Sequence, residues 1–320
     1  MNKYKKLLSN TIIFGIGTFG SKILVFLLMP LYTSVLKKSD FGIVDLIIQT
    51  SNLLIPIVSL GIANAVIRFG LDRSIKKSDV FSIGLVTILL GFGIFLVLIP
   101  VLRRITYISD YTALIYIFVF MSCLRTLCSQ FVRAKEYVRL YALDGVLSTI
   151  TIIIFNVLFL VVLKLGITGY VLAIVISDLL STTFLFFSAN LKRYIKLKNI
   201  NRDLAKAMLK YSIPLIPATI FWWITNVSNR FIVAYSLGSE ANGLFAASYK
   251  IPTIVVLISN IFMDAWQMSA VSDDDKASRA KFFSKVFNVY QSVLFLCASG
   301  IVLFSKLITK ILVSNAYYPS

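Results

Sequence analysis

The stretch KIPTIVVLISNIFMDAWQ, residues 250–267, decides the fold because it places a stripe of polar side chains in an otherwise apolar segment. The stripe positions recur every three or four residues, at Lys250, Thr253, Leu257, Asn260, Asp264 and Gln267. At about 100° per residue, this spacing confines them to one face of a helix. Polar groups in hydrocarbon need protein partners or water, so this face is predicted to point into a bundle or a cavity.

A second stripe with the same phase lies 201 residues earlier, at Asp45, Gln49, Asn52, Pro56, Ser59 and Ala63. The turn at residues 36–42 matches residues 237–243 at the same offset. The first helix of each half carries one strong cation, and these are Lys22 and Arg230. In the second half, that cation shares a helix face with Thr219, Trp223 and Asn226. Because repeated halves around one binding site are a recurrent plan of secondary transporters, we predict two halves around a shared aqueous cavity.

The composition indicates a membrane protein. Of the 320 residues, 58% are hydrophobic and 14% are charged, and the mean hydropathy of +0.87 is too high for a soluble domain. The net charge of +18 sits between apolar spans and not in a patch with interleaved aromatic residues, so no nucleic-acid partner is predicted. Histidine is absent, and no nucleophile, paired-carboxylate or phosphate-loop motif is visible. We therefore predict no enzyme activity, no metal site and no cofactor.

Apolar spans set the predicted helices. A helix needs roughly 20 apolar residues to cross the ~30 Å hydrocarbon core. Nine such spans are predicted, at about 10–36, 41–67, 80–102, 111–132, 140–163, 167–189, 211–237, 241–271 and 286–304. The overlong spans are expected to kink at prolines such as Pro56 and Pro252. The fold class is therefore an all-α polytopic membrane protein.

The domain organisation follows from these spans. Residues 1–190 form a predicted N-lobe of six transmembrane helices, and residues 211–320 form a partial C-lobe of three. The basic segment at 191–210 is a predicted cytoplasmic linker that lies on anionic lipid as an amphipathic segment. Because the second half has three of the six expected helices, we expect a truncated chain. Lys and Arg favour one set of loops by about three to one, which places the N-terminus in the cytoplasm.

Four short motifs resemble those of a known family. They are Leu7-Leu8-Ser9-Asn10-Thr11, Pro30-Leu31-Tyr32, Asp40-Phe41-Gly42 and the stretch GIANAVIRF at residues 61–69. Their order and spacing resemble the polysaccharide biosynthesis proteins. These are the Wzx-type oligosaccharide flippases of the multidrug, oligosaccharidyl-lipid and polysaccharide exporter superfamily.

The resemblance implies a MATE-like fold of two helical lobes of inverted-V type, in the bacterial cytoplasmic membrane. It implies alternating access that moves an oligosaccharide linked to undecaprenyl diphosphate from the inner to the outer leaflet. The expected partners are that substrate and membrane lipids, with a polysaccharide polymerase and the chain-length machinery as further candidates. The cations of the first two helices of each lobe would meet the diphosphate, and here they are Lys22, Arg68, Arg230 and Lys250.

Each candidate residue also has a structural interpretation. Lys250 would instead pair with an acidic residue such as Asp264, Arg230 would extend to the headgroups, and Arg68 would be a cytoplasmic anchor. Asp45 would either bind a coupling Na⁺ or proton, or neutralise Lys22. The polar lining of the predicted cavity comprises Asp45, Gln49, Asn52, Ser59, Asn226, Thr253, Asn260 and Asp264.

Three other features leave alternatives open. Arg125 is expected to pair with Asp144 or Asp178 in a structural role. At least one of Trp222 and Trp223 is expected to be an interfacial or lipid-facing anchor. For the whole chain, the alternatives to a flippase are a cation-coupled multidrug exporter of the same superfamily and a truncated remnant or assembly partner that does not transport.

Overall fold

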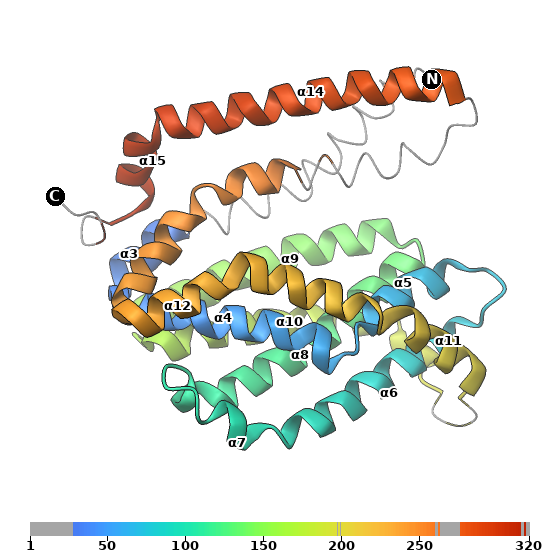
Figure 1. Ribbon diagram of the computed structural model, residues 1–320. Coiled ribbons are helices and arrows are strands. Elements are labelled where there is room, and N and C mark those ends of the chain that lie inside the picture. The colour runs from blue at the N-terminus through green and yellow to red at the C-terminus, as the bar shows by residue number, and fades with distance from the viewer. Residues whose placement is uncertain are drawn as a thin grey trace. The chain divides into compact units, whose positions relative to one another are not determined.

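The structure is a computed structural model, and it describes residues 28–196, 198, 200–259, 262, 276–314 and 317 (Figure 1). Its elements are helical throughout the described ranges, which confirms the all-α class. They are α3 (Met29–Val35), α4 (Lys38–Val58), α5 (Ile62–Leu71), α6 (Lys77–Leu96), α7 (Ile99–Leu102), η2 (Ser109–Tyr111), α8 (Thr112–Ala134), α9 (Val138–Asn156), η3 (Val157–Val162), α10 (Gly166–Ser188), η4 (Leu191–Tyr194), α11 (Arg202–Ser212), α12 (Leu215–Lys250), α14 (Lys276–Leu303) and α15 (Ser305–Leu312).

Seven helices within the described ranges are long and apolar enough to cross a membrane. They correspond to seven of the nine spans predicted from the sequence. The other two, at 10–36 and 241–271, extend into residues outside the described ranges.

The chain divides into two compact units. The larger runs from Val35 to Gly243, and the smaller combines the chain up to Ser34 with the chain from Leu244 onward. The larger unit holds α4 to α11 and most of α12, so it extends across the linker predicted at 191–210. The lobes expected at 1–190 and 211–320 remain a prediction.

Helix α8 forms the centre of the larger unit. It packs against α4, α5 and α10, and α10 packs in turn against α9 (Figure 1). The side chains of Ile115, Val119 and Leu127 on α8 are completely buried. Helix α9, by contrast, exposes a row of apolar side chains at Leu143, Val146, Ile150 and Ile154. Their spacing of three or four residues gives α9 one apolar outer face, as expected for a helix that contacts lipid.

The predicted span at 41–67 is broken, but not at its proline. Pro56 lies inside α4, and the break comes at Leu60 and Gly61, whose φ angles are 50° and 60°. A left-handed pair ends the helix, because the glycine adopts that conformation at little cost. The helix thus continues through Pro56, and the break at Leu60 and Gly61 was not predicted.

The polar stripe that begins at Lys250 is also interrupted. Helix α12 ends at Lys250, Ile251 and Pro252 form a turn, and a new helical segment begins at Thr253. The hydroxyl of Thr253 donates a hydrogen bond to the carbonyl oxygen of Lys250 across this turn. Pro252 has no N–H to continue the helical ladder, which explains the break. The kink expected at Pro252 is therefore confirmed, and it divides the stripe between two helical segments.

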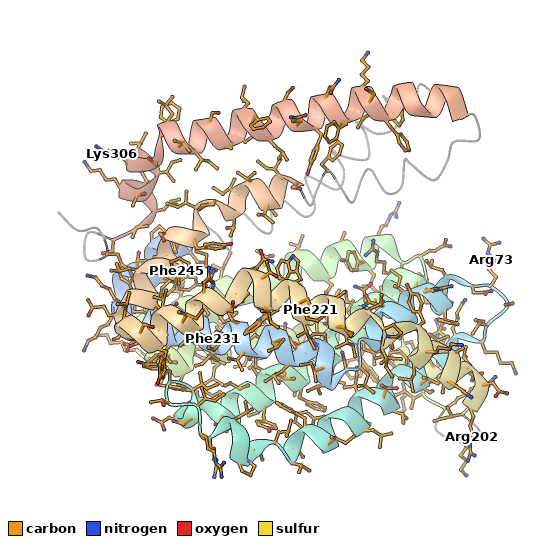
Figure 2. All side chains as sticks on the ribbon, in the orientation of Figure 1. Arg73, Arg202, Phe221, Phe231, Phe245 and Lys306 are labelled. Carbon is orange, nitrogen blue, oxygen red and sulfur yellow. The ribbon has the colours of Figure 1, made fainter. Side chains whose placement is uncertain are left out.

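Helix α11 begins within the segment predicted as a linker and ends at Ser212. Asn201 caps it, with its side-chain oxygen accepting from the N–H of Leu204 at 3.0 Å. Met208 is completely buried, whereas the charged side chains on the opposite face are exposed. Figure 2 shows Arg202 of α11 and Arg73 projecting at the same end of the larger unit, where the sequence places cytoplasmic loops.

The smaller unit contains α14 and α15. The ring of Tyr290 on α14 stacks on Phe262 with centroids 4.5 Å apart, and its hydroxyl lies 2.6 Å from that of Ser259. At the end of α15, the backbone N–H of Ser314 donates to the hydroxyl of Thr33 at 3.0 Å. These contacts hold the segments of this unit together.

Candidate functional site

A buried ion pair joins α4 to α12. The guanidinium Nη1 of Arg230 lies 2.6 Å from the Oδ2 atom of Asp45. The two residues are only 7% and 4% exposed, so neither charge is solvated by bulk water. Both belong to the larger unit and to predicted membrane spans, where an unpaired charge would be costly.

The same two helices make a second polar contact one turn along α4. The indole N–H of Trp223 donates to the backbone carbonyl of Gln49 at 2.9 Å, and the Gln49 amide lies 3.4 Å from Asp45. Trp223 and Arg230 are seven residues apart, which places them on one face of α12. The polar face of α4 and the predicted polar face of α12 therefore meet.

The structure corrects one of the expectations for these residues. The Arg230 side chain does not extend toward headgroups, because its guanidinium is buried against Asp45. Asp45 has this arginine as its ion-pair partner, whereas Lys22, the partner weighed from the sequence, lies outside the described residues. Helical spacing assigned each residue to a face but did not identify the helix that the face contacts.

No contact with the Asp45–Arg230 pair is described for the other candidate residues from Asn226 onward. Asn226 donates to the carbonyl of Trp222 within its own helix, at 2.8 Å. Lys250 is half-buried at the end of α12, next to the turn that leads to Thr253. Asn260 and Asp264 lie outside the described residues, so their role in a cavity stays a prediction.

The candidate residues nearer the C-terminal end of α4 differ in their exposure to solvent. Asn52 is exposed and Ser59 is buried at the C-terminal end of the helix. Arg68 is exposed on α5, and its guanidinium carbon lies 4.3 Å from the centre of the Tyr211 ring on α11. Asp45 is thirteen residues from the end of α4, so α4 alone separates it from α5 by about 20 Å. The structure therefore does not bring Arg68 to the Asp45–Arg230 pair.

A second charged cluster lies among α8, α9 and α10. Arg125 contacts Asp178 at 2.9 Å and Asp144 at 4.0 Å, which confirms the pairing expected from the sequence. Its Nε atom donates to Ser181 at 3.1 Å, Ser181 donates to Asp144, and Ser122 donates to Asp178. Each carboxylate thus has a hydroxyl donor in addition to the arginine. No three His, Cys, Asp or Glu side chains in the described part of the chain gather as a metal site.

Sequence reasoning missed the contact between the two matching turns. Asn242 is completely buried, and its Nδ2 atom donates to the carbonyl oxygen of Gly42 at 2.9 Å. Lys38 and Glu240 of the same two turns form a partly exposed ion pair at 3.6 Å. The offset of 201 residues related these two turns, but a sequence offset does not say that the related segments touch.

Comparison with known proteins identifies similar families and folds. The family model described as "Polysaccharide biosynthesis protein" matches residues 7–266. No curated protein sequence is similar enough to the chain to count as a match.

Solved structures show the same fold. An inward-facing multidrug resistance MATE family transporter of the MOP superfamily superimposes with a TM-score of 0.71 at 15% identity, covering 90% of this chain and 71% of the other. The outward-facing conformation of such a transporter gives 0.69 at 16% identity, covering 97% and 75%. A MATE protein in the straight conformation gives 0.64 at 15% identity, covering 95% and 72%. At these identities the likeness establishes the fold, which is MATE-like.

Proposed function

Because the chain belongs to the polysaccharide biosynthesis protein family, we propose that it moves a lipid-linked oligosaccharide across the bacterial cytoplasmic membrane. The family and the fold are those of membrane transporters. The proposed substrate is an oligosaccharide carried on undecaprenyl diphosphate, and the N-terminus is proposed to be cytoplasmic. Transport would proceed by alternating access without covalent chemistry.

The observation that carries this proposal is the guanidinium of Arg230, held within a membrane-spanning helix by Asp45. An arginine within a membrane-spanning segment is costly unless it is paired, so such a residue is a functional candidate by default. The guanidinium offers several donors in a planar fork that suits phosphate oxygens. An anionic diphosphate would compete with the Asp45 carboxylate for these donors.

The sequence offers further cations for the diphosphate. Lys22 and Lys250 are proposed for this role on the family resemblance alone. Gln49 and Asn52 on the polar face of α4 supply amides that hydrogen-bond to sugar hydroxyls. Asp45 remains the proposed site for a coupling Na⁺ or proton, which would bind when Arg230 turns to the substrate. Arg68 is better assigned as an anchor at the cytoplasmic end, since its guanidinium packs on Tyr211.

A cation-coupled multidrug exporter is the second candidate, favoured by the MATE-like fold. In that case Asp45 would bind the cation, and the buried arginine would regulate access to it. This candidate predicts gradient-driven efflux of a lipophilic cation such as ethidium from proteoliposomes, with loss of efflux in Asp45→Asn.

Native mass spectrometry of the purified full chain tests the flippase proposal. The ligand is an undecaprenyl-diphosphate oligosaccharide, and undecaprenol is the uncharged control. We expect the wild type to prefer the diphosphate lipid by roughly tenfold or more, because hydrogen bonds to charged groups contribute about 1.5–3 kcal/mol. Arg230→Gln and Lys22→Ala/Lys250→Ala should lose this preference, whereas Arg230→Lys should keep part of it.

The controls separate a lost site from a lost fold. Arg193→Gln removes the same charge from the exposed end of the larger unit and should bind like the wild type. Asp45→Asn/Arg230→Gln removes both charges of the ion pair, so it avoids leaving a carboxylate unpaired. Equal binding of both lipids by the wild type, or an unchanged preference in both Arg230→Gln variants, would overturn the proposed site and favour the exporter or non-transporting alternatives.

A further inference from the structure

Two glycines bring the start of α4 and the bend of α12 into backbone contact. A methyl group on Gly42 would overlap the carbonyl oxygen of Ser239 and lie 2.8 Å from the backbone nitrogen of Gly243. A methyl group on Gly243 would overlap the carbonyl oxygen of Lys38 and lie 3.3 Å from the nitrogen of Gly42. Neither position can accept a side chain without moving a backbone segment.

These contacts are reciprocal under the internal repeat. Gly42 and Gly243 are separated by 201 residues, and Lys38 and Ser239 by the same number. The contact of Gly42 with Ser239 therefore has its counterpart in the contact of Gly243 with Lys38. A local two-fold axis consequently passes between the two glycines, and the matching turns of the two halves meet on it.

The bend that allows this crossing is specific to one residue. Gly238 has a φ angle of 88° and a ψ angle of 168°, which interrupts the otherwise continuous helix α12. This conformation is accessible to glycine and strained for residues with a side chain. Residues 239–243 are thereby directed across the first turn of α4, so that Gly243 reaches Gly42.

Polar side-chain contacts also join the two turns at the crossing. Asn242 donates one hydrogen bond to Gly42, while its Oδ1 atom has no hydrogen-bond partner among the described residues. The Lys38–Glu240 ion pair is partly exposed, with side chains 31% and 68% accessible, and exposed pairs contribute little to stability. The described side-chain contacts that separation of the two turns would break are therefore one hydrogen bond and one partly exposed ion pair.

We propose that the crossing of Gly42 and Gly243 is the gate that closes the external end of the transport path, an inference that rests on the proposed function. The predicted topology places residues 36–42 and 237–243 at the external face. Backbone contact at the crossing leaves no room for water or a sugar between the two halves. Release of substrate to the outside requires these two turns to separate.

A cysteine at the buried position 242 reports whether the crossing opens. Asn242→Cys is introduced after Cys123, Cys128 and Cys297 are replaced by alanine, and labelling by a membrane-impermeant maleimide is timed in vesicles of each orientation. Adding Gly42→Ala should force the turns apart and speed labelling from the external side by roughly tenfold, equivalent to about 1.4 kcal/mol of overpacking. Gly93→Ala is the matched control, because nothing lies within 4 Å of the added methyl group.

The labelling rates decide the gate assignment. Equal rates in Gly42→Ala and Gly93→Ala would overturn the gate, and faster labelling only from the cytoplasmic side would overturn the external assignment. This measurement needs no substrate, so it is independent of the lipid-binding test.

A reversible cross-link distinguishes a gate from a permanent junction, with both glycines left in place. Lys38→Cys/Glu240→Cys is joined by a short bis-methanethiosulfonate reagent, and flipping of the lipid-linked oligosaccharide is measured in proteoliposomes. We expect at least a tenfold loss of transport on cross-linking, and recovery after dithiothreitol reduces the disulfides that join the reagent to the two cysteines. Unchanged transport would mean that the crossing never opens. If the wild type shows no preference for the diphosphate lipid in mass spectrometry, while the labelling rates change as expected, the proposed substrate alone is refuted.

Discussion

The Arg125 cluster offers a direct test of charge balance inside the larger unit. Arg125→Gln removes the guanidinium that contacts Asp178 at 2.9 Å and Asp144 at 4.0 Å, and leaves two carboxylates that are nearly fully buried. Breaking a buried ion pair costs about 3–5 kcal/mol. Because the Arg125 side chain is 31% exposed, we expect a loss near the lower end of that range, about 3 kcal/mol, in the free energy of unfolding.

The measurement is reversible unfolding of the full chain in detergent micelles by a denaturant series. Asp178→Asn added to Arg125→Gln returns the formal charge of the cluster to its original value, so the double variant should recover most of the loss. Arg133→Gln is the matched control, because it removes the same charge from an exposed position on the same helix. The guanidinium carbon of Arg133 lies 5.9 Å from the centre of the Tyr141 ring. A loss below about 1 kcal/mol for Arg125→Gln, or strictly additive losses in the double variant, would refute the charge-balance argument.

Three further variants test individual contacts by the same unfolding measurement or by hydrogen exchange. Trp223→Phe removes the hydrogen bond to the carbonyl of Gln49 and should cost about 1 kcal/mol, whereas a value near zero would mean that the bond is absent. Gly61→Ala should cost about 1–2 kcal/mol, because an alanine must adopt the φ angle of 60° at the end of α4, and unchanged stability would contradict that backbone conformation. Asn201→Ala should lower the stability of α11 by about 1 kcal/mol, seen as faster amide exchange at Leu204; an unchanged exchange rate would exclude the capping bond.

Helical periodicity predicted which faces are polar, but not which faces meet. The stripe on α4 and the face of Trp223 and Arg230 were both evident from spacings of three, four and seven residues. Their contact through Asp45 depends on tertiary packing, which periodicity does not encode. The pairing of Arg125 was easier to predict, because a charge within an apolar span requires an opposite charge nearby.

The backbone break at Pro252 was predicted and is confirmed, whereas the break at Leu60 and Gly61 was not predicted. Pro56 is the stronger local signal for a kink, yet the left-handed backbone at Leu60 and Gly61 ends the helix. The turn at residues 237–243 was recognised by its match to residues 36–42, and the bend at Gly238 confirms it. For Lys22, Asn260 and Asp264, the sequence remains the source of the assignment, since they lie outside the described residues.

The glycine crossing also constrains how the two halves could have diverged. Of the seven residue pairs that relate 36–42 to 237–243, only Leu36 with Leu237 and Gly42 with Gly243 are identical. In an ancestor made of two identical half-length chains, the residue on the two-fold axis would have faced its own copy. Any substitution there would have added a side chain on both sides of the contact, so the residue had to stay small in both copies of the chain. If such a chain were duplicated and fused, the neighbouring positions could differ, whereas each glycine would still be required by the backbone of the other half.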